Sequence, residues 1–325
     1  METEPSRTCS IEIDPEGYFE GLSKQSMKFH NALGELIDNG ISANISDVEY
    51  FDDANPDEYF RLQITVSRVA GDEVEVTVAD SGCGMSMDDL ENHILRQGDR
   101  SEAGGILNEH GMGLKNALSV LTKNEGDSPF KILTKSEDDS ELGEQEYVAI
   151  EGPFREDMPM NTRSSNDEWT DGADSLSDMS TGTRVHFTTT MDMFRSTYPS
   201  GQTISGVIPG LRERLGVIYR HFLQHSNNNH IHLHYSDEVR DEGGQTQVKP
   251  VFPVFKEGED EDGVPWHRSD TIEVEDSDGK IHEVEYNRGI VDWEATREKY
   301  ESDEFKGLST GRSGSPFRIH YRNNQ

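Results

Sequence analysis

In the first half of the chain, apolar residues recur with the spacing of helices in some segments and with the spacing of strands in others. Between residues 11 and 45, Met27, Leu33 and Ile37 lie near one face of a predicted helix. Residues 59–69 and 73–80 alternate apolar and polar positions around a Gly-Asp turn, which predicts a β-hairpin. Further helices are predicted near 86–95 and 112–123, further strands at 130–135, 146–151 and 183–189, and a flexible acidic surface loop at 155–181.

The second half opens with an amphipathic helix, in which Ile208, Leu211, Leu215, Ile218 and Phe222 follow a three-four spacing. Alternating strands are predicted near 230–235, 271–275 and 283–290, with an acidic loop at 256–263. We therefore expect an α+β protein with one domain over residues 1–195 and a smaller α/β domain over residues 200–325.

The charge balance is strongly acidic, with 30 Lys and Arg against 64 Asp and Glu and a formal net charge of −34. The acidic excess is dispersed along the chain, and Lys (11) is scarcer than Arg (19). A dispersed carboxylate surface keeps a protein hydrated in molar salt, where screening weakens self-repulsion. The pattern favours a halophilic source over a nucleic-acid mimic, and it does not exclude DNA as a partner because salt screens the repulsion.

The remaining composition argues against a membrane protein, a secreted protein and a disulfide-rich protein. No run of 18 apolar residues occurs, and the N-terminal residues lack an apolar signal region, so we expect a cytoplasmic protein that does not bind membranes. Cys9 and Cys83 are too few for a disulfide framework. The five histidines between 221 and 234 would need a preserved geometry across two elements to bind a metal, and their role stays open.

A first candidate constellation lies on the predicted helix at Glu35-Leu36-Ile37-Asp38-Asn39. Glu35, Asn39 and Ala43 are spaced by four residues and so share one helical face. A carboxylate can deprotonate a water, and an amide oxygen can bind Mg²⁺. Taken alone, the pattern also fits a solvated polar face.

A second constellation, Asp80-Ser81-Gly82-Cys83-Gly84-Met85, follows directly after a predicted strand. Asp80 can accept a hydrogen bond from an exocyclic amine such as that of adenine. Gly82 and Gly84 allow the backbone to pass close to a flat ring, although a simple tight turn is the alternative. Cys83 is interpreted as a small buried residue and not as a redox group.

A third constellation is rich in glycine, with Gly104-Gly105 followed by His110-Gly111-Met112-Gly113-Leu114-Lys115 at the start of a predicted helix. Exposed N–H groups at a helix N-terminus favour phosphate, and Lys115 adds a positive charge. The segment is not a Walker A loop, because no GxxxxGK[ST] pattern occurs in the chain.

Together and in this order, these motifs resemble those of the GHKL superfamily of gyrase B, histidine kinase, heat-shock chaperone and MutL ATPases. ELIDNGISA resembles its N box, DSGCGM its adenine-binding turn, HGMGLKNAL its lid hinge, and Gly182-Thr183 its late Gly-Thr motif. The resemblance implies a Bergerat-type sandwich of helices over an antiparallel or mixed sheet. The lead-in IDPEGYFEGLS, Gly98 to Ser101 and Lys115 are most similar to MORC-type and related prokaryotic proteins, and the second half resembles their transducer region.

The resemblance also implies roles. Glu35 would be the general base and Asn39 the Mg²⁺ ligand, and Asp80 would bind adenine. The other residues expected to contact ATP are Ala43, Gly82, Gly84, Met85, Gly98, Ser101, Gly111, Met112, Gly113, Leu114, Lys115 and Thr183.

We expect a slow, Mg-dependent ATPase that drives a conformational and dimerisation switch. By analogy with these relatives, it would act in DNA transactions or defence. A non-hydrolysing nucleotide sensor and a chaperone-like ATPase remain alternatives. Residues 316–324 resemble a strand that relatives continue, so we expect the chain to be part of a longer protein that forms an ATP-dependent homodimer. Lys306 or Arg312 is the nearest candidate for a cation that would reach the terminal phosphate.

The acidic composition predicts a salt requirement. Structure should be retained near molar salt and lost at ~0.1 M, where the Debye length grows from about 3 to about 10 Å and carboxylate repulsion is less screened. Circular-dichroism melts across this range measure the effect. Equal melting temperatures at both salt concentrations would contradict the halophilic interpretation.

Overall fold

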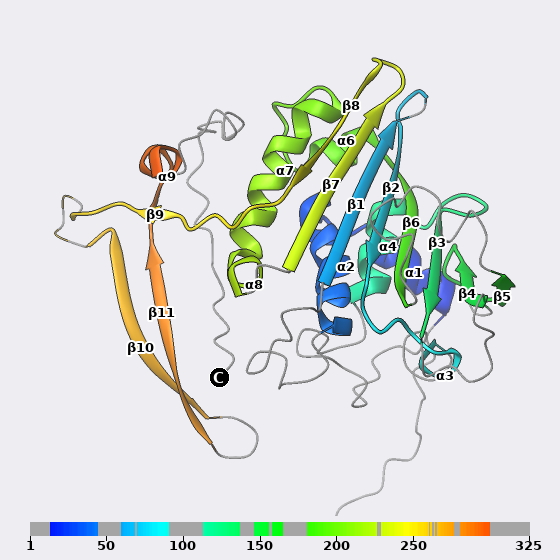
Figure 1. The fold of residues 1–325 in the computed structure, drawn as a ribbon, viewed down its shortest axis with the longest axis horizontal. Coiled ribbons are helices and arrows are strands. Elements are labelled where there is room, and N and C mark those ends of the chain that lie inside the picture. The colour runs from blue at the N-terminus through cyan, green and yellow to red at the C-terminus, as the bar shows by residue number, and fades with distance from the viewer. Residues whose placement is uncertain are drawn as a thin grey trace, which may run out of the picture.

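A single large sheet with helices packed on one face forms the main body of the protein (Figure 1). The computed structural model describes residues 14–44, 60–68, 70–90, 113–136, 146–155, 158–164, 181–225, 229–259, 261, 263, 265–275 and 280–299. The α+β class and the mixed sheet agree with the fold expected from the sequence.

The sheet has eight strands in the order β5-β4-β3-β6-β2-β1-β7-β8. Neighbouring strands are antiparallel except β1 and β7, which are parallel, so the sheet is mixed. The strands are β1 (Phe60–Arg68), β2 (Glu73–Asp80), β3 (Phe130–Lys135), β4 (Glu146–Glu151), β5 (Met160–Ser164), β6 (Gly182–Thr190), β7 (Asn229–Asp237) and β8 (Glu242–Gln247).

Helices α1, α3, α6 and α7 begin at side chains that cap free backbone N–H groups. Asp14 caps α1 through Gly17, and Thr203 caps α7 through Gly206. The helices are α1 (Pro15–Ser23), α2 (Phe29–Asn44), α3 (Met87–Asp89), α4 (Gly113–Thr122), α6 (Met191–Arg195), α7 (Ile204–Ile218), α8 (Arg220–His225) and α9 (Trp293–Lys299).

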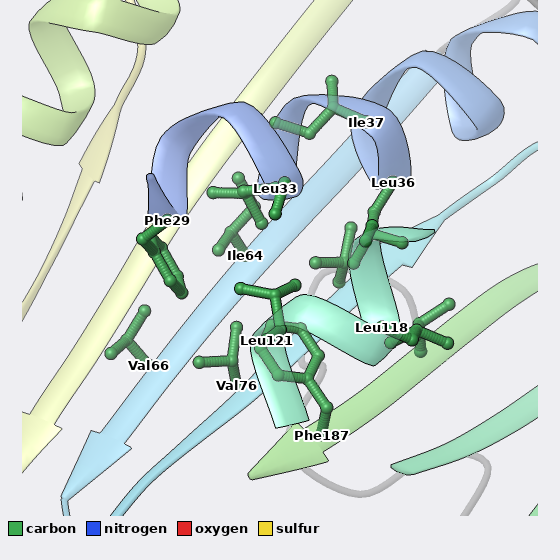
Figure 2. Packing of buried hydrophobic residues seen from close by; sticks show 14 of the residues in the cluster. Phe29, Leu33, Leu36, Ile37, Ile64, Val66, Val76, Leu118, Leu121 and Phe187 are labelled. Atoms are coloured by element: carbon green, nitrogen blue, oxygen red, sulfur yellow. The ribbon is translucent and has the colours of Figure 1, made fainter. Parts of the chain in front are cut away.

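The core lies between the sheet and α2, α4 and α7, and it forms because each helix has one apolar stripe. Figure 2 shows how the side chains of α2 and α4 meet those of the strands. The residues labelled there are Phe29, Leu33, Leu36, Ile37, Ile64, Val66, Val76, Leu118, Leu121 and Phe187, and all are buried. Burial of this stripe fixes which face of α2 points away from the core, and that face carries the predicted polar residues.

A separate hairpin, β10 (His267–Glu275) with β11 (Ile281–Gly289), extends away from the large sheet (Figure 1). Two short strands, β9 (Val254–Phe255) and β12 (Val291–Asp292), pair beside α9. Among the helices of the described ranges, none has both the length and the apolar character of a membrane span.

Most predicted elements are confirmed, and the structure also forms elements that the sequence did not predict: α1 in the segment before α2, and α6, α9, β9 and β12. Further corrections concern two strands and one helix. Met160–Ser164, inside the predicted surface loop 155–181, forms the edge strand β5, and β8 was not predicted because EGGQTQ lacks apolar alternation. An edge strand needs only backbone pairing on one side, so polar sequences are tolerated there. The predicted helix across Ile208 and Phe222 is divided at Tyr219 into α7 and α8.

The predicted division near residue 195 remains a prediction. The sheet crosses this point because β7 pairs with β1 along nine residues, and Ile231 and Leu233 of β7 belong to the same core as α2. The predicted strand at 316–324, Lys306 and Arg312 lie outside the described residues.

Candidate nucleotide-binding site

One face of α2 carries the first candidate residues. Glu35, Asn39 and Ala43 follow one another at intervals of four, and all three are half-buried. Eight residues of helix span about 12 Å. This face therefore places a carboxylate at one end and a small side chain at the other, over a distance that a nucleoside triphosphate can bridge.

The Ala43 end of this face meets the end of β2, where Asp80 is buried with 9% of its surface exposed. Gly82 N–H donates to Asp80 Oδ1 at 2.9 Å. A Cβ at Gly40 of α2 would lie 3.0 Å from Asp80 Cβ and 3.2 Å from Oδ2. The absence of a side chain at Gly40 thus allows the helix to approach the carboxyl group.

Burial raises the pKa of Asp80 to about 6, and hydrogen bonds from the backbone of Gly82 and Thr183 and the charge of Arg184 oppose that rise. Arg184 is itself buried, and desolvation lowers its pKa to about 10. An ionised Asp80 at neutral pH is a desolvated hydrogen-bond acceptor, which is suited to bind an amine donor.

The turn after Asp80 packs tightly on α2. Cys83 N–H donates to the carbonyl of Ala43 at 3.3 Å, and a Cβ at Gly82 would lie 2.8 Å from Ala43 Cβ. Gly84 has a φ of 72°, in the left-handed region that favours glycine. Contrary to the sequence interpretation, Cys83 is exposed, and its thiol lies 3.4 Å from the carbonyl oxygen of Gly84.

Thr134 of β3 connects this turn to the late Gly-Thr motif, and sequence reasoning missed it. Its hydroxyl accepts from Met85 N–H at 2.8 Å and lies 3.3 Å from the carbonyl of Gly182 and 3.2 Å from Thr183 Oγ1. Thr183 is buried and lies opposite Asp80 in the β2–β6 register. The structure thus brings the second and fourth motifs together around one buried hydroxyl.

The other end of the α2 face meets the N-terminus of α4. A Cβ at Gly113 would lie 2.5 Å from Glu35 Oε2 and 3.6 Å from its Cδ, so the carboxyl group lies directly against this glycine. Burial raises the pKa of Glu35. A carboxylate with a raised pKa beside a helix N-terminus can take a proton and lies where phosphate binding is favoured.

Asp38, one turn from Glu35, is a further buried acid that the sequence did not single out for a role. Burial raises its pKa to about 6, while a hydrogen bond from Tyr219 lowers it and the charge of Glu35 adds to the rise. Tyr219 lies 181 residues further along the chain, so its contact with α2 has no local sequence signal.

The remaining predicted residues divide into two groups. Leu114 and Met85 are partly buried against the core, and Lys115 is 1% exposed within α4, so their contacts with a nucleotide stay predictions. Four predicted contact residues lie outside the described residues: Gly98, Ser101, Gly111 and Met112.

The role of the histidines between 221 and 234 stays open. His230 and His232 lie on one face of β7 with ring centroids 5.7 Å apart, and Gln247 Nε2 lies 2.5 Å from His230 Nδ1. Within the described part of the chain, no three His, Cys, Asp or Glu side chains gather as metal ligands would.

A comparison with known protein families finds a match to the first half of the chain. Residues 27–168 match the family of histidine kinase-, DNA gyrase B- and HSP90-like ATPases. This segment of the chain is therefore similar to the GHKL ATPases. The matched range contains α2, β1 to β5 and α4, and it includes Glu35, Asp80 and Gly113. The match suggests ATP binding and hydrolysis, the general activity of that family.

Other comparisons add little to the GHKL assignment. One solved structure, described as the N-terminal domain of a DNA repair protein, is 13% identical with a TM-score of 0.40, over 84% of this chain and 69% of that one. This similarity is too weak to carry a conclusion about function. The curated proteins include no significant match.

The raised pKa of Asp80 predicts a pH-dependent stability. The folded protein holds this proton up to about pH 6 and the unfolded chain only to about 4, so this carboxyl group makes the fold less stable as pH rises through that interval. Asp80→Asn should therefore stabilise the ligand-free protein above pH 6, by at most about 3 kcal/mol, and the gain should shrink between pH 6 and pH 4. Denaturant unfolding at several pH values measures this.

The exposed Asp72→Asn serves as the control and should change stability little at any pH. A loss of stability in Asp80→Asn at pH 8 would show that the carboxylate is held favourably in the fold, contrary to the assignment.

Proposed function

We propose that residues 27–168 form a GHKL-type domain that binds MgATP along the half-buried polar face of α2 and hydrolyses it. The supporting observation is that α2 lies against the buried acceptor Asp80 of β2 near Gly40 and, at its other end, presents the Glu35 carboxyl group to the N-terminus of α4. A simple binding module needs the first feature but has no use for the second.

The described residues fit a nucleotide with Mg²⁺. Glycines at 40 and 82 leave the space in which Asp80 is packed, and the carboxyl group of Asp80 would accept from the adenine amine. Asn39 has a neutral amide oxygen, a kind of ligand that Mg²⁺ prefers. Within the described ranges, no three His, Cys, Asp or Glu side chains gather, which fits an ion bound mainly by phosphates and water. Bound Mg²⁺ would neutralise phosphate charge.

Glu35 is the proposed general base. Its half-buried carboxyl group has a raised pKa and lies against Gly113, so it can orient a water and accept its proton next to the helix N-terminus that would hold phosphate. Thr183 and Thr134 would hold the turn under the adenine. Gly111, Met112, Gly113 and Lys115 stay as proposed contacts of the phosphates.

The finer parts of the proposal are a slow rate, a conformational switch with dimerisation in a longer protein, and a role in DNA transactions or defence. They rest on the resemblance of the lead-in and of residues 98–101 and 111–115 to MORC-type proteins. A non-hydrolysing sensor is the alternative, and the placement of Glu35 argues against it.

Two substitutions should separate catalysis from binding. Glu35→Ala should keep ATP affinity within a few-fold and lower turnover by about 10²-fold or more, because a general base acts in the chemical step. Asp80→Asn should instead weaken binding, because an amide can present a donor to the donor amine. Calorimetry and phosphate release measure the two effects.

The Asp72→Asn variant is again the control and should match wild type in both assays. Unchanged turnover in Glu35→Ala would remove its catalytic role. Binding without any phosphate release, in wild type and variant alike, would support the sensor.

A further inference from the structure

Tyr219 lies at the joint between α7 and α8, with its ring buried in the main core. Its hydroxyl lies 2.8 Å from Asp38 Oδ1 and 3.1 Å from the carbonyl oxygen of Gly34. Both acceptors belong to α2. One hydroxyl proton is thus shared between two acceptors on the helix that carries the proposed catalytic base.

The contact spans the helical turn that contains Glu35. Gly34 precedes Glu35, and Asp38 completes the turn, so a hydroxyl bound at both positions fixes this turn from one side. A Cβ at Gly34 would lie 3.6 Å from the Tyr219 hydroxyl, which shows how closely the two helices approach. Phenylalanine would fill the same space, so packing alone does not explain the hydroxyl.

Tyr219 is also tied to the later part of the chain. Gly216, one turn before it in α7, accepts from Val251 N–H at 2.9 Å. Residue 251 leads directly into β9, which pairs with β12. A continuous set of contacts therefore runs from the segment before β9, through the end of α7, to the turn of α2 that holds Glu35.

We propose that Tyr219 is a positioning residue that orients Glu35 and couples it to the second half of the chain. The inference rests on the proposed role of Glu35. Tyr219 is buried and its hydroxyl contacts Gly34 and Asp38, so it would act on the site through α2. It holds the backbone and Asp38 on the buried side of α2, so that the Glu35 carboxyl group stays against Gly113.

The test compares full-length wild type with Tyr219→Phe. The variant should keep ATP affinity within about threefold and lower kcat by about 10- to 100-fold, because a small misplacement of a catalytic group is costly. Hydrogen exchange of amides in α2 should become several-fold faster without nucleotide. Addition of a non-hydrolysable ATP analogue should slow exchange at the C-terminal end of α7 in wild type but not in the variant.

Tyr235→Phe is the matched control, because this tyrosine lies on β7 beside Gly244 of β8. It should match wild type in turnover and exchange. If Tyr219→Phe does not fold, Asp38→Ala, which removes the carboxyl acceptor of the same hydroxyl, should give the same loss of kcat and faster exchange.

The outcomes separate the two proposals. Full turnover in Glu35→Ala would overturn the catalytic role and this inference with it. Loss of turnover in Glu35→Ala, combined with wild-type kcat and α2 exchange in Tyr219→Phe, would overturn the inference alone. A parallel loss of affinity and kcat with lower stability would reduce Tyr219 to a structural role and also contradict it.

Discussion

The close approach of α2 to the end of β2 and to the start of α4 is the constraint on which the site depends. At each contact a glycine replaces a side chain that would collide, with Gly40 and Gly82 at the Asp80 end and Gly113 at the Glu35 end. The apolar stripe of α2 holds the helix on the sheet, and the glycines determine how near its polar face comes to neighbouring backbone. One rigid helix thereby sets the spacing between the two carboxyl groups.

This arrangement holds three carboxyl groups, those of Glu35, Asp38 and Asp80, where burial removes part of their hydration. Burial raises the pKa of Asp80 and of Asp38 to about 6 and also raises the pKa of Glu35. Perturbed acids gathered beside glycine-rich backbone are typical of functional sites. The well-packed core beneath α2 offsets the cost of their burial, and hydrogen bonds from Gly82 and Tyr219 keep two of the carboxyl groups in place.

The sequence predicted what local periodicity and spacing can encode. The stripe with Leu33 and Ile37 predicted α2, and the spacing of Glu35, Asn39 and Ala43 predicted its polar face, because both depend only on the helical repeat. Asp80 was predicted from its place after a strand. Thr134 and Tyr219 were missed because each acts through partners from distant parts of the chain, and nothing near either residue in sequence marks the contact. The strands β5 and β8 were missed because edge strands need no apolar alternation.

The most direct test of the spacing set by α2 compares Gly40→Ala with Gly113→Ala. Alanine in place of glycine favours a helix by up to about 1 kcal/mol, so neither change should unfold the protein through helix propensity. Gly40→Ala should press on Asp80 and weaken ATP binding about tenfold, whereas Gly113→Ala should displace Glu35 and lower turnover by a larger factor than affinity. Binding and phosphate release measured on the same samples would then show opposite patterns in the two variants. Wild-type binding and turnover in both would contradict the claim that α2 positions the two carboxyl groups.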